Sequence, residues 1–217
     1  MDSQMRLVFA SNNAHKLEEV RAIMPAGVEV LSLHEVGFEH EIDETGTTLS
    51  ENSRIKAETV VVWLKANDKW SSVDGVFADD TGLEIDALDG KPGVYTARWY
   101  LQNKLTSEGM NELTRERDIF HANRTKALRE LEGKDDRGAQ FKTVITLITN
   151  NQDLQVEGIV RGQIAKEEYG VGGFGYDPIF IPEGYDKTFG ELPAEVKNGI
   201  SHRARALQAL VKVIGNR

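Results

Sequence analysis

The chain has 217 residues and a net charge of −9 at pH 7. Hydrophobic residues make up 40% of it and charged residues 28%, a composition typical of a globular protein. It contains no cysteine, which excludes disulfides, thiolate catalysis and cysteine-bound zinc. Its acidic charge disfavours nucleic acid as a partner, because affinity for that backbone comes from neutralising phosphates. No apolar run approaches the roughly 20 residues that span a bilayer, and no secretory signal is evident. We therefore expect a cytoplasmic protein that binds no membrane.

The first third of the chain alternates strands and helices. Residues 6–10 form a short apolar run typical of a strand, and residues 16–24 have apolar side chains at helical spacing. Residues 28–33 predict a second strand, which we expect to lie parallel to the first. Thr48 and Glu51 have the spacing of a capping box for a helix that runs to about Lys69.

The remaining elements are predicted from their apolar patterns. Residues 76–78 form a short apolar strand that leads into Asp79-Asp80-Thr81-Gly82, and residues 83–88 alternate like a strand. Residues 106–132 are polar and favour helix, so we expect a surface helix. Residues 139–149 and 154–165 alternate on either side of a turn and predict a hairpin. Ser201 is a suitable N-cap for a last helix, whose apolar stripe comprises Ala204, Leu207, Leu210, Val211 and Ile214.

Together these elements predict an α/β fold with a mixed sheet. We expect one domain over residues 1–217 that is divided into two lobes with a cleft between them.

A polar turn between the first strand and the first helix could bind phosphate. It comprises Ser11, Asn12, Asn13, Ala14, His15 and Lys16. A helix N-terminus presents unpaired N–H groups and the positive end of a dipole, and Lys16 adds a full charge. The segment lacks the P-loop pattern, and a simple helix cap with an exposed lysine explains it equally well.

Acidic pairs at Asp43-Glu44 and Asp79-Asp80 could bind a hard cation. Carboxylates without histidine or cysteine suit Mg²⁺, which binds to one or two carboxylates and bridges to substrate phosphates. Each pair alone could equally be a solvated turn. Lys56 follows Asn52 by one helical turn and could reach phosphates from a second side or simply be a surface lysine.

Residues 172–203 hold the densest group of reactive and aromatic side chains. Phe174 and Tyr176 offer flat apolar faces, Asp177 could accept a hydrogen bond from a ring N–H group, and Lys197, His202 and Arg203 could donate to ring carbonyls. His202 and Arg203 could also be ordinary first-turn residues of a helix. A planar heterocycle with carbonyl edges would suit this set.

These blocks, in this order, resemble the inosine triphosphate pyrophosphatase family, whose members are Ham1-like enzymes. The matching segments are FASNNAHKLEEV, IDETGTTLSENSRIKA, ADDTGLEIDALDGKPGVYTARW, GGFGYDPIFIPEG and ELPAEVKNGISHRARAL. The resemblance implies an elongated mixed α/β fold with flanking helices, two lobes around a central cleft, and a homodimer. It also implies Mg²⁺-dependent hydrolysis of ITP, dITP and XTP to the monophosphate and pyrophosphate.

The resemblance also implies a role for each matching residue. Asp80 corresponds to the catalytic carboxylate and a metal ligand, and Asp43 and Glu44 to the acidic pair near the metal. The residues that correspond to substrate contacts are Ser11, Asn12, Asn13, Ala14, His15 and Lys16 for the triphosphate, Lys56 and Thr81 beside them, and Phe174, Gly175, Tyr176, Asp177, Lys197, His202 and Arg203 for the base.

The chain departs from the family pattern at two places. The acidic pair is commonly Glu-Glu but is Asp43-Glu44 here, which leaves open which of the two would bind the metal. Residues 100–137 match poorly. A Maf-like nucleotide pyrophosphatase acting on pyrimidine or modified nucleotides is the rival enzyme, and a non-catalytic nucleotide-binding module is the other alternative.

Overall fold

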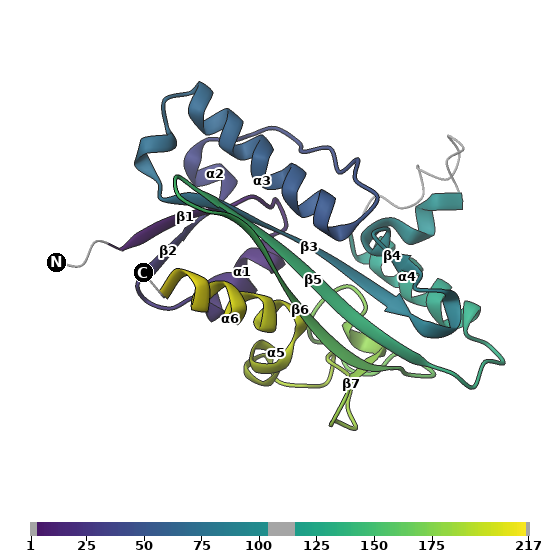
Figure 1. The fold of residues 1–217 in the computed structure, drawn as a ribbon. Coiled ribbons are helices and arrows are strands. Elements are labelled where there is room, and N and C mark those ends of the chain that lie inside the picture. The colour runs from purple at the N-terminus through teal and green to yellow at the C-terminus, as the bar shows by residue number, and fades with distance from the viewer. Residues whose placement is uncertain (1–3, 104–115, 216–217) are drawn as a thin grey trace. The chain divides into compact units, whose positions relative to one another are not determined.

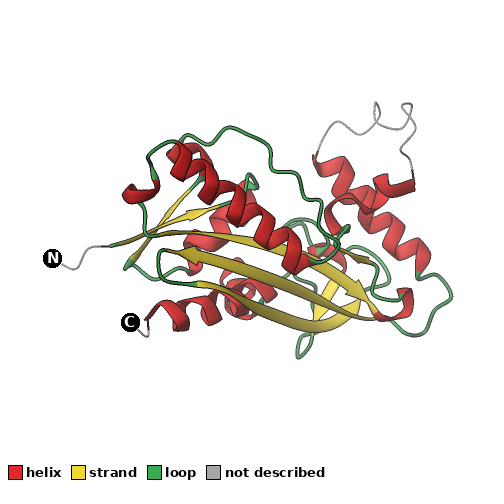
Figure 2. Ribbon diagram, turned by 45° about the horizontal axis from the view of Figure 1, so that its top comes forward, coloured by secondary structure: helices red, strands yellow, loops and turns green. Residues whose placement is uncertain are grey.

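The computed structural model describes residues 4–103 and 116–215, which fold as helices around a mixed sheet (Figures 1 and 2). Its strands are β1 (Met5–Phe9), β2 (Val28–Leu31), β3 (Gly75–Ile85), β4 (Pro92–Gly93), β5 (Gly138–Thr149), β6 (Asp153–Ile164) and β7 (Phe180–Pro182). Its α-helices are α1 (Ala14–Ile23), α2 (Leu33–Val36), α3 (Leu49–Ala66), α4 (Glu116–Glu130), α5 (Ala194–Ile200) and α6 (His202–Gly215). The strand order is β2-β1-β3-β5-β6-β7, and β4 pairs with β3. The predicted α/β class with a mixed sheet and flanking helices is confirmed.

The chain divides into two compact units. Unit 1 comprises Met1–Asp80, Thr143–Gly158 and Ser201–Arg217, and unit 2 comprises Thr81–Lys142 and Ile159–Ile200. Strands β3, β5 and β6 each contribute residues to both units, and the chain passes between the units once more at Ile200–Ser201, between α5 and α6.

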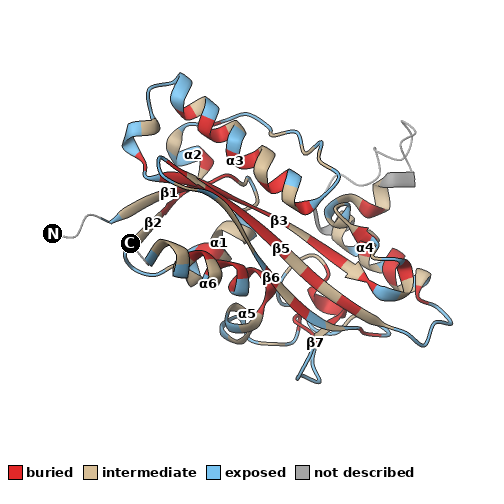
Figure 3. Cartoon of the chain, viewed as in Figure 1, coloured by how far each residue is buried: buried red, intermediate tan, exposed pale blue. Residues whose placement is uncertain are grey.

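Unit 1 packs helices on both faces of its strands. Successive side chains of a strand point to opposite faces, so β1 directs Leu7 and Phe9 to one face and Val8 to the other. Val8 belongs to a core that includes Val60 and Leu64 of α3. On the opposite face, Leu7 and Phe9 share a core with α1 and α6, through Val20, Leu207 and Leu210. Figure 3 shows the buried residues that line these elements.

The predicted helix starts and the first strand pair are confirmed. Strands β1 and β2 are parallel, with Leu7 opposite Val30. Thr48 and Glu51 form the capping box of α3, since the Thr48 side chain accepts from the Glu51 N–H and the Glu51 side chain accepts from the Thr48 N–H. The Ser201 hydroxyl accepts from the Ala204 N–H at the start of α6. β5 and β6 are neighbours joined by a short turn, as the hairpin prediction requires.

Unit 2 has its own apolar core. It includes Leu83 and Ile85 of β3, Phe141 of β5, Ala127 of α4 and Phe180 of β7. Phe141 and Phe180 meet edge to face with ring centroids 4.7 Å apart. This core gives unit 2 an apolar interior separate from those of unit 1.

The structure corrects two predictions. β3 is one continuous strand through Asp79-Asp80-Thr81-Gly82, and it ends at Ile85, where the prediction had separate strands and a possible turn. The predicted surface helix over residues 106–132 is α4 within the described residues, and it buries Asn123, Lys126 and Ala127. Lys126 is buried because its Nζ donates to the Trp99 carbonyl (3.0 Å) and lies over the Trp99 ring.

Across residues 4–103 and 116–215, none of the helices is both apolar and long enough to cross a membrane.

Candidate active site

Asp79 lies at the centre of a buried charge cluster on one face of β3. Its Oδ1 lies 3.0 Å from Nζ of Lys16, and its Oδ2 accepts from Nε of Arg203 at 3.1 Å. Nη1 of Arg203 also pairs with Glu19 of α1. The side chains of Asp79 and Arg203 are 1% and 2% exposed, so these charges interact with little screening by water. We call Lys16, Glu19, Asp79 and Arg203 the Asp79 cluster.

The cations of the Asp79 cluster set its protonation. Burial alone would raise the pKa of Asp79, but Lys16 and Arg203 outweigh this and hold the pKa far below its usual range. Burial lowers the pKa of Lys16, and the nearby cations Lys56 and Arg203 act in the same direction. An additional anion beside Lys16 would therefore relieve repulsion among the cations.

Asp80 forms a second cluster with Lys56 and Glu44. Nζ of Lys56, on α3, lies 3.2 Å from Oδ1 of Asp80 and 2.6 Å from Oε1 of Glu44. The other oxygen of Asp80, Oδ2, is buried without a hydrogen-bond partner among the described residues. A buried carboxylate oxygen in this condition can accept a proton or bind a cation. We call Glu44, Lys56 and Asp80 the Asp80 cluster.

Burial changes the pKa of Asp80 in the direction opposite to that of Asp79. Loss of solvation raises the pKa of Asp80, although Lys56 and Lys16 partly counteract it. For Lys56, burial lowers the pKa, but the charges of Asp80 and Glu44 more than offset this and leave the pKa raised. The Asp80 cluster thus combines a cation with a carboxylate of enhanced basicity.

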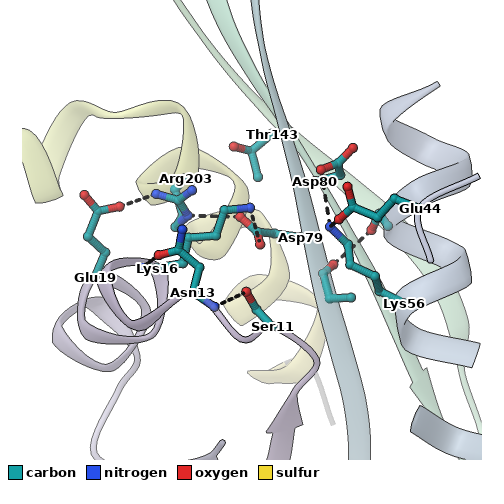
Figure 4. Close-up of polar contacts among 12 residues, drawn as sticks. Ser11, Asn13, Lys16, Glu19, Glu44, Lys56, Asp79, Asp80, Thr143 and Arg203 are labelled. Carbon is teal, nitrogen blue, oxygen red and sulfur yellow. Dashed lines mark hydrogen bonds and ion pairs between the residues drawn. The ribbon is translucent and has the colours of Figure 1, made fainter. Parts of the chain in front are cut away.

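The two clusters lie on opposite faces of the same strand (Figure 4). Asp79 and Asp80 are consecutive on β3, so their side chains point in opposite directions. Lys16 still acts electrostatically on Asp80, and Lys56 on Asp79. Two lysines from different helices therefore lie within electrostatic range of both carboxylates.

The segment before α1 has the geometry of a helix cap. Asn13 is the N-cap, and its Oδ1 accepts from the Lys16 N–H at 3.0 Å. The Ser11 hydroxyl accepts from the Asn13 N–H at 3.2 Å. Asn12, Ala14 and His15 are exposed. Among the residues predicted to bind the triphosphate, Lys16 is the one that joins the Asp79 cluster.

Buried hydrogen bonds fix α3 against the strands and so position Lys56. The Ser53 hydroxyl, one helical turn before Lys56, contacts the Ala78 carbonyl (2.9 Å) and the Thr146 hydroxyl (2.8 Å). The Asn52 Oδ1 accepts from the Gly46 N–H at 2.8 Å. This bond fixes the segment that carries Glu44 to the same helix.

His202 is held by a strand residue. Its Nδ1 lies 2.6 Å from the Thr143 hydroxyl on β5, and the two side chains are buried. A hydrogen bond at one ring nitrogen of a histidine fixes the orientation of the ring and thus of the other nitrogen. The start of α6 therefore supplies His202 and Arg203 in fixed orientations.

The residues predicted to bind the base in unit 2 also form a cluster. One oxygen of Asp177, Oδ2, accepts from the Phe174 N–H (2.7 Å) and from Nζ of Lys197 (2.7 Å). That ammonium lies 4.8 Å from the centre of the Phe174 ring. Gly173 has φ +68°, and a Cβ there would meet Asp177 at 2.1 Å, so this turn requires glycine. We call residues 173–177 the base loop.

The structure brings together most, but not all, of the predicted site residues within each unit. In unit 1, Lys16, Glu44, Lys56, Asp80, His202 and Arg203 take part in the buried contacts described above. In unit 2, Phe174, Gly175 and Asp177 belong to the base loop, and Lys197 contacts it through Asp177. Tyr176 of the same loop is buried and donates to the Thr96 carbonyl. Thr81 follows Asp80 on β3 and is half-buried.

The acidic pair is divided by its surroundings. Glu44 is half-buried and paired with Lys56, whereas Asp43 is exposed. Among the described residues, no group of three or more histidine, cysteine or carboxylate side chains is arranged to hold a metal ion. Glu44 and Asp80 could still serve, because Mg²⁺ uses one or two protein carboxylates and keeps several waters. The buried, unpartnered Oδ2 of Asp80 fits such an ion.

Sequence reasoning missed three residues of the site. Asp79 appeared only as half of an acidic pair, and Glu19 and Thr143 were not considered. The spacing of Glu19 from Lys16, three residues along α1, places the two on one helix face. No sequence signal singled out Thr143, because its partner His202 is 59 residues away.

Comparisons with known proteins agree on one family. A family model described as the Ham1 family matches residues 7–213. A dITP/XTP pyrophosphatase of Flavobacterium johnsoniae is 42% identical over 210 residues, which is 97% of this chain and 98% of that protein. A dITP/XTP pyrophosphatase of Bacillus subtilis is 43% identical over 211 residues, covering 95% of this chain and 96% of that protein.

Solved structures give the same result for the fold. A HAM1 protein from Coxiella burnetii superposes with a TM-score of 0.78 at 33% identity, covering 98% of this chain and 100% of that one. The Staphylococcus aureus Ham1 protein gives a TM-score of 0.75 at 35% identity, with the same coverage. The mixed α/β fold with flanking helices that the resemblance predicted is therefore confirmed.

Proposed function

Because this chain belongs to the Ham1 family, we propose that it hydrolyses the non-canonical purine nucleoside triphosphates ITP, dITP and XTP to the monophosphate and pyrophosphate. The names of its relatives, dITP/XTP pyrophosphatases, support the substrate class. The observation that carries the proposal is Asp80, whose buried carboxylate is paired with Lys56 through one oxygen while the other has no partner among the described residues.

Asp80 is the general base of the proposed reaction. The Asp80 carboxylate accepts a proton from water as the water attacks at the α–β linkage of the triphosphate, and pyrophosphate leaves. A base works best when its pKa lies near the working pH, so the raised pKa of Asp80 supports this role. Lys56 holds Oδ1 and thereby orients the carboxylate.

Lys16 and Lys56 bind the triphosphate in this proposal. Both ammonium groups already face carboxylates, so they are held in place before substrate arrives. Ser11, Asn12, Asn13, Ala14 and His15 form the turn at the N-terminus of α1, where the positive end of the helix dipole attracts phosphate oxygens.

Mg²⁺ is the proposed cofactor. Glu44 and Asp80 would hold it, Asp43 would add negative charge beside them, and the ion would supply charge neutralisation on the phosphates. The fit rests on the unpartnered oxygen of Asp80 and on two carboxylates that share Lys56.

The base is read by donors. Hypoxanthine and xanthine carry a carbonyl at position 6, which accepts from His202 or Arg203, whereas adenine carries an amino donor there. With adenine, a donor would face a donor, and two buried polar groups would be left without partners. Such a mismatch can lower kcat/KM for the adenine nucleotide by about 10⁴-fold. Phe174 stacks on the base, and Asp177 and Lys197 hold Phe174 in position.

The test is a substrate panel. Purified protein is incubated with ITP, dITP, XTP, ATP, GTP, UTP and dTTP, and pyrophosphate is measured separately from free phosphate. We expect pyrophosphate from the first three with Mg²⁺, and none with EDTA. Preference for UTP or dTTP would instead support the Maf-like alternative, and no turnover of any nucleotide would support a binding module.

The remaining expectations belong to the same proposal. The protein works as a cytoplasmic homodimer that binds no nucleic acid, and residues 1–217 act as one domain with two lobes. The net charge of −9 supports the lack of nucleic-acid binding. Sedimentation velocity of the purified protein tests the dimer directly.

A further inference from the structure

Helix α4 contacts the base loop through two side chains. Nη1 of Arg124 donates to the Gly175 carbonyl at 2.8 Å, and the ring centroid of Phe120 lies 6.3 Å from that of Phe174. Both lie on α4, within the part of the chain that the Ham1 family model spans. All of these residues lie in unit 2.

Arg124 is itself fixed in place. Its Nη2 pairs with Oε2 of Glu168 at 3.0 Å, and its side chain is 14% exposed. The planar guanidinium of Arg124 therefore links α4 both to Glu168 and to the base loop. A planar guanidinium can donate hydrogen bonds in two fixed directions at once. The ammonium of a lysine donates with less directional control.

The glycines of the base loop make its backbone costly to order, so contacts that hold it in place matter. Gly173 and Gly175 have φ of +68° and +62°, so the loop contains two glycines in the left-handed region. Glycine loses more conformational freedom on ordering than any other residue. Asp177 fixes the loop at the Phe174 N–H, and Arg124 fixes it at the Gly175 carbonyl. The peptide bond between Phe174 and Gly175 is thus flanked by a bond on each side.

We propose that Arg124 is a positioning residue that orders the base loop before substrate binds, with Phe120 packing against the Phe174 ring. This inference rests on the proposed function, because it assumes that Phe174 stacks on the nucleobase. It gives helix α4 a part in substrate affinity. Arg124 acts through the loop and touches neither phosphates nor the reacting atoms.

The experiment compares Arg124→Met with Arg129→Met. Arg129 lies on the same helix and is exposed, so its substitution removes the same charge from α4 without touching the loop. Hydrogen–deuterium exchange is followed in peptides that cover residues 172–177, without nucleotide. KM and kcat are measured with XTP, and thermal melting checks the fold.

We expect Arg124→Met to speed exchange in the base loop and to raise KM about tenfold with kcat within about twofold, the size of effect for losing a hydrogen bond from a charged donor. Arg129→Met should match the parent in both measurements. Unchanged loop exchange in Arg124→Met, equal effects of the two variants, or a fall in kcat at constant KM would each overturn the proposal.

A second variant, Arg124→Lys, tests the proposal if Arg124→Met does not fold. Arg124→Lys keeps the charge opposite Glu168 but lacks the fork that also reaches Gly175, so faster loop exchange is expected with normal melting. Parent-like exchange in Arg124→Lys would overturn the proposal. If the parent protein released no pyrophosphate, the proposed function would fail, while loop exchange would still report whether Arg124 holds the loop.

Discussion

Nζ of Lys56 lies 3.2 Å from Oδ1 of Asp80, while Oδ2 of the same carboxylate is buried without a partner among the described residues. The two oxygens of one side chain thus have different surroundings. One is held by a cation that orients the group, and the other is left to react. The pairing of Lys56 with Glu44 at 2.6 Å fixes the cation from its other side.

Asp80→Asn should abolish most of the turnover. The amide cannot accept a proton from water, so we expect kcat for XTP to fall at least about 100-fold with little change in melting temperature. Asp135→Asn, at an exposed position, is the control and should match the parent. Turnover of Asp80→Asn within a few fold of the parent would reject Asp80 as the base.

The pH dependence of stability should carry the signature of Asp80. Burial raises its pKa, so its contribution to stability is present at pH below the ordinary aspartate pKa and is lost as the pH rises through the folded-state value. Urea unfolding from pH 4 to 7 should show a loss of free energy of unfolding that is smaller in Asp80→Asn. An identical pH slope in both proteins would contradict the raised pKa.

Asp79→Asn should destabilise the protein, in contrast to Asp80→Asn. The substitution leaves Lys16 and Arg203 buried with less compensation, which costs roughly 3 kcal/mol at pH 7. Because the pKa of Asp79 is lowered, its stabilisation is present above the ordinary aspartate pKa and is lost as the pH falls through the folded-state value. Urea unfolding at pH 7 and pH 3 measures both effects. The difference between variant and parent should shrink in acid, and a constant difference would argue against this linkage.

Glu44→Gln and Asp43→Asn should separate the two members of the acidic pair. Glu44 is paired with Lys56 beside Asp80, whereas Asp43 is exposed. We expect Glu44→Gln to raise the Mg²⁺ concentration for half-maximal activity by roughly tenfold, and Asp43→Asn to change it little. Titrating Mg²⁺ at saturating XTP gives the comparison. The reverse order would assign the direct ligand to Asp43.

Thr143→Val should loosen the reading of the base. Valine keeps the shape of threonine but cannot bond Nδ1 of His202, so the ring loses its fixed orientation. The preference for XTP over ATP should fall about fivefold, as expected for one hydrogen bond, while Thr143→Ser should keep it. Nitrogen-15 NMR of the His202 ring reports the tautomer independently. An unchanged spectrum and preference in Thr143→Val would rule out this role.

Local patterns predicted the elements well because each rests on contacts within a few residues. The capping box of Thr48 and Glu51 and the N-cap Ser201 are read directly from spacing, and both are confirmed. The strand break expected near Asp79-Asp80 was wrong, since β3 runs through both residues, and their partners Lys16, Lys56 and Arg203 are distant in sequence. A sequence window that shows two adjacent carboxylates cannot show their partners.

The sequence predicted which residues belong to the candidate site better than it predicted their positions in space. The resemblance supplied Lys16, Lys56 and Asp80, and the structure brings them within electrostatic range of one another. It did not supply the division between the faces of β3, which follows from strand alternation once residues 75–85 are known to be one strand. Nor did it supply Glu19 or Thr143, whose partners Arg203 and His202 lie 184 and 59 residues away.

Unit 1 is assembled from three stretches of chain that are distant in sequence, and the Asp79 cluster draws Lys16 from the first and Arg203 from the last. A polypeptide released from the ribosome before residue 203 would lack the guanidinium that Asp79 and Glu19 share. The Asp79 cluster is therefore complete only after nearly the whole chain has been synthesised.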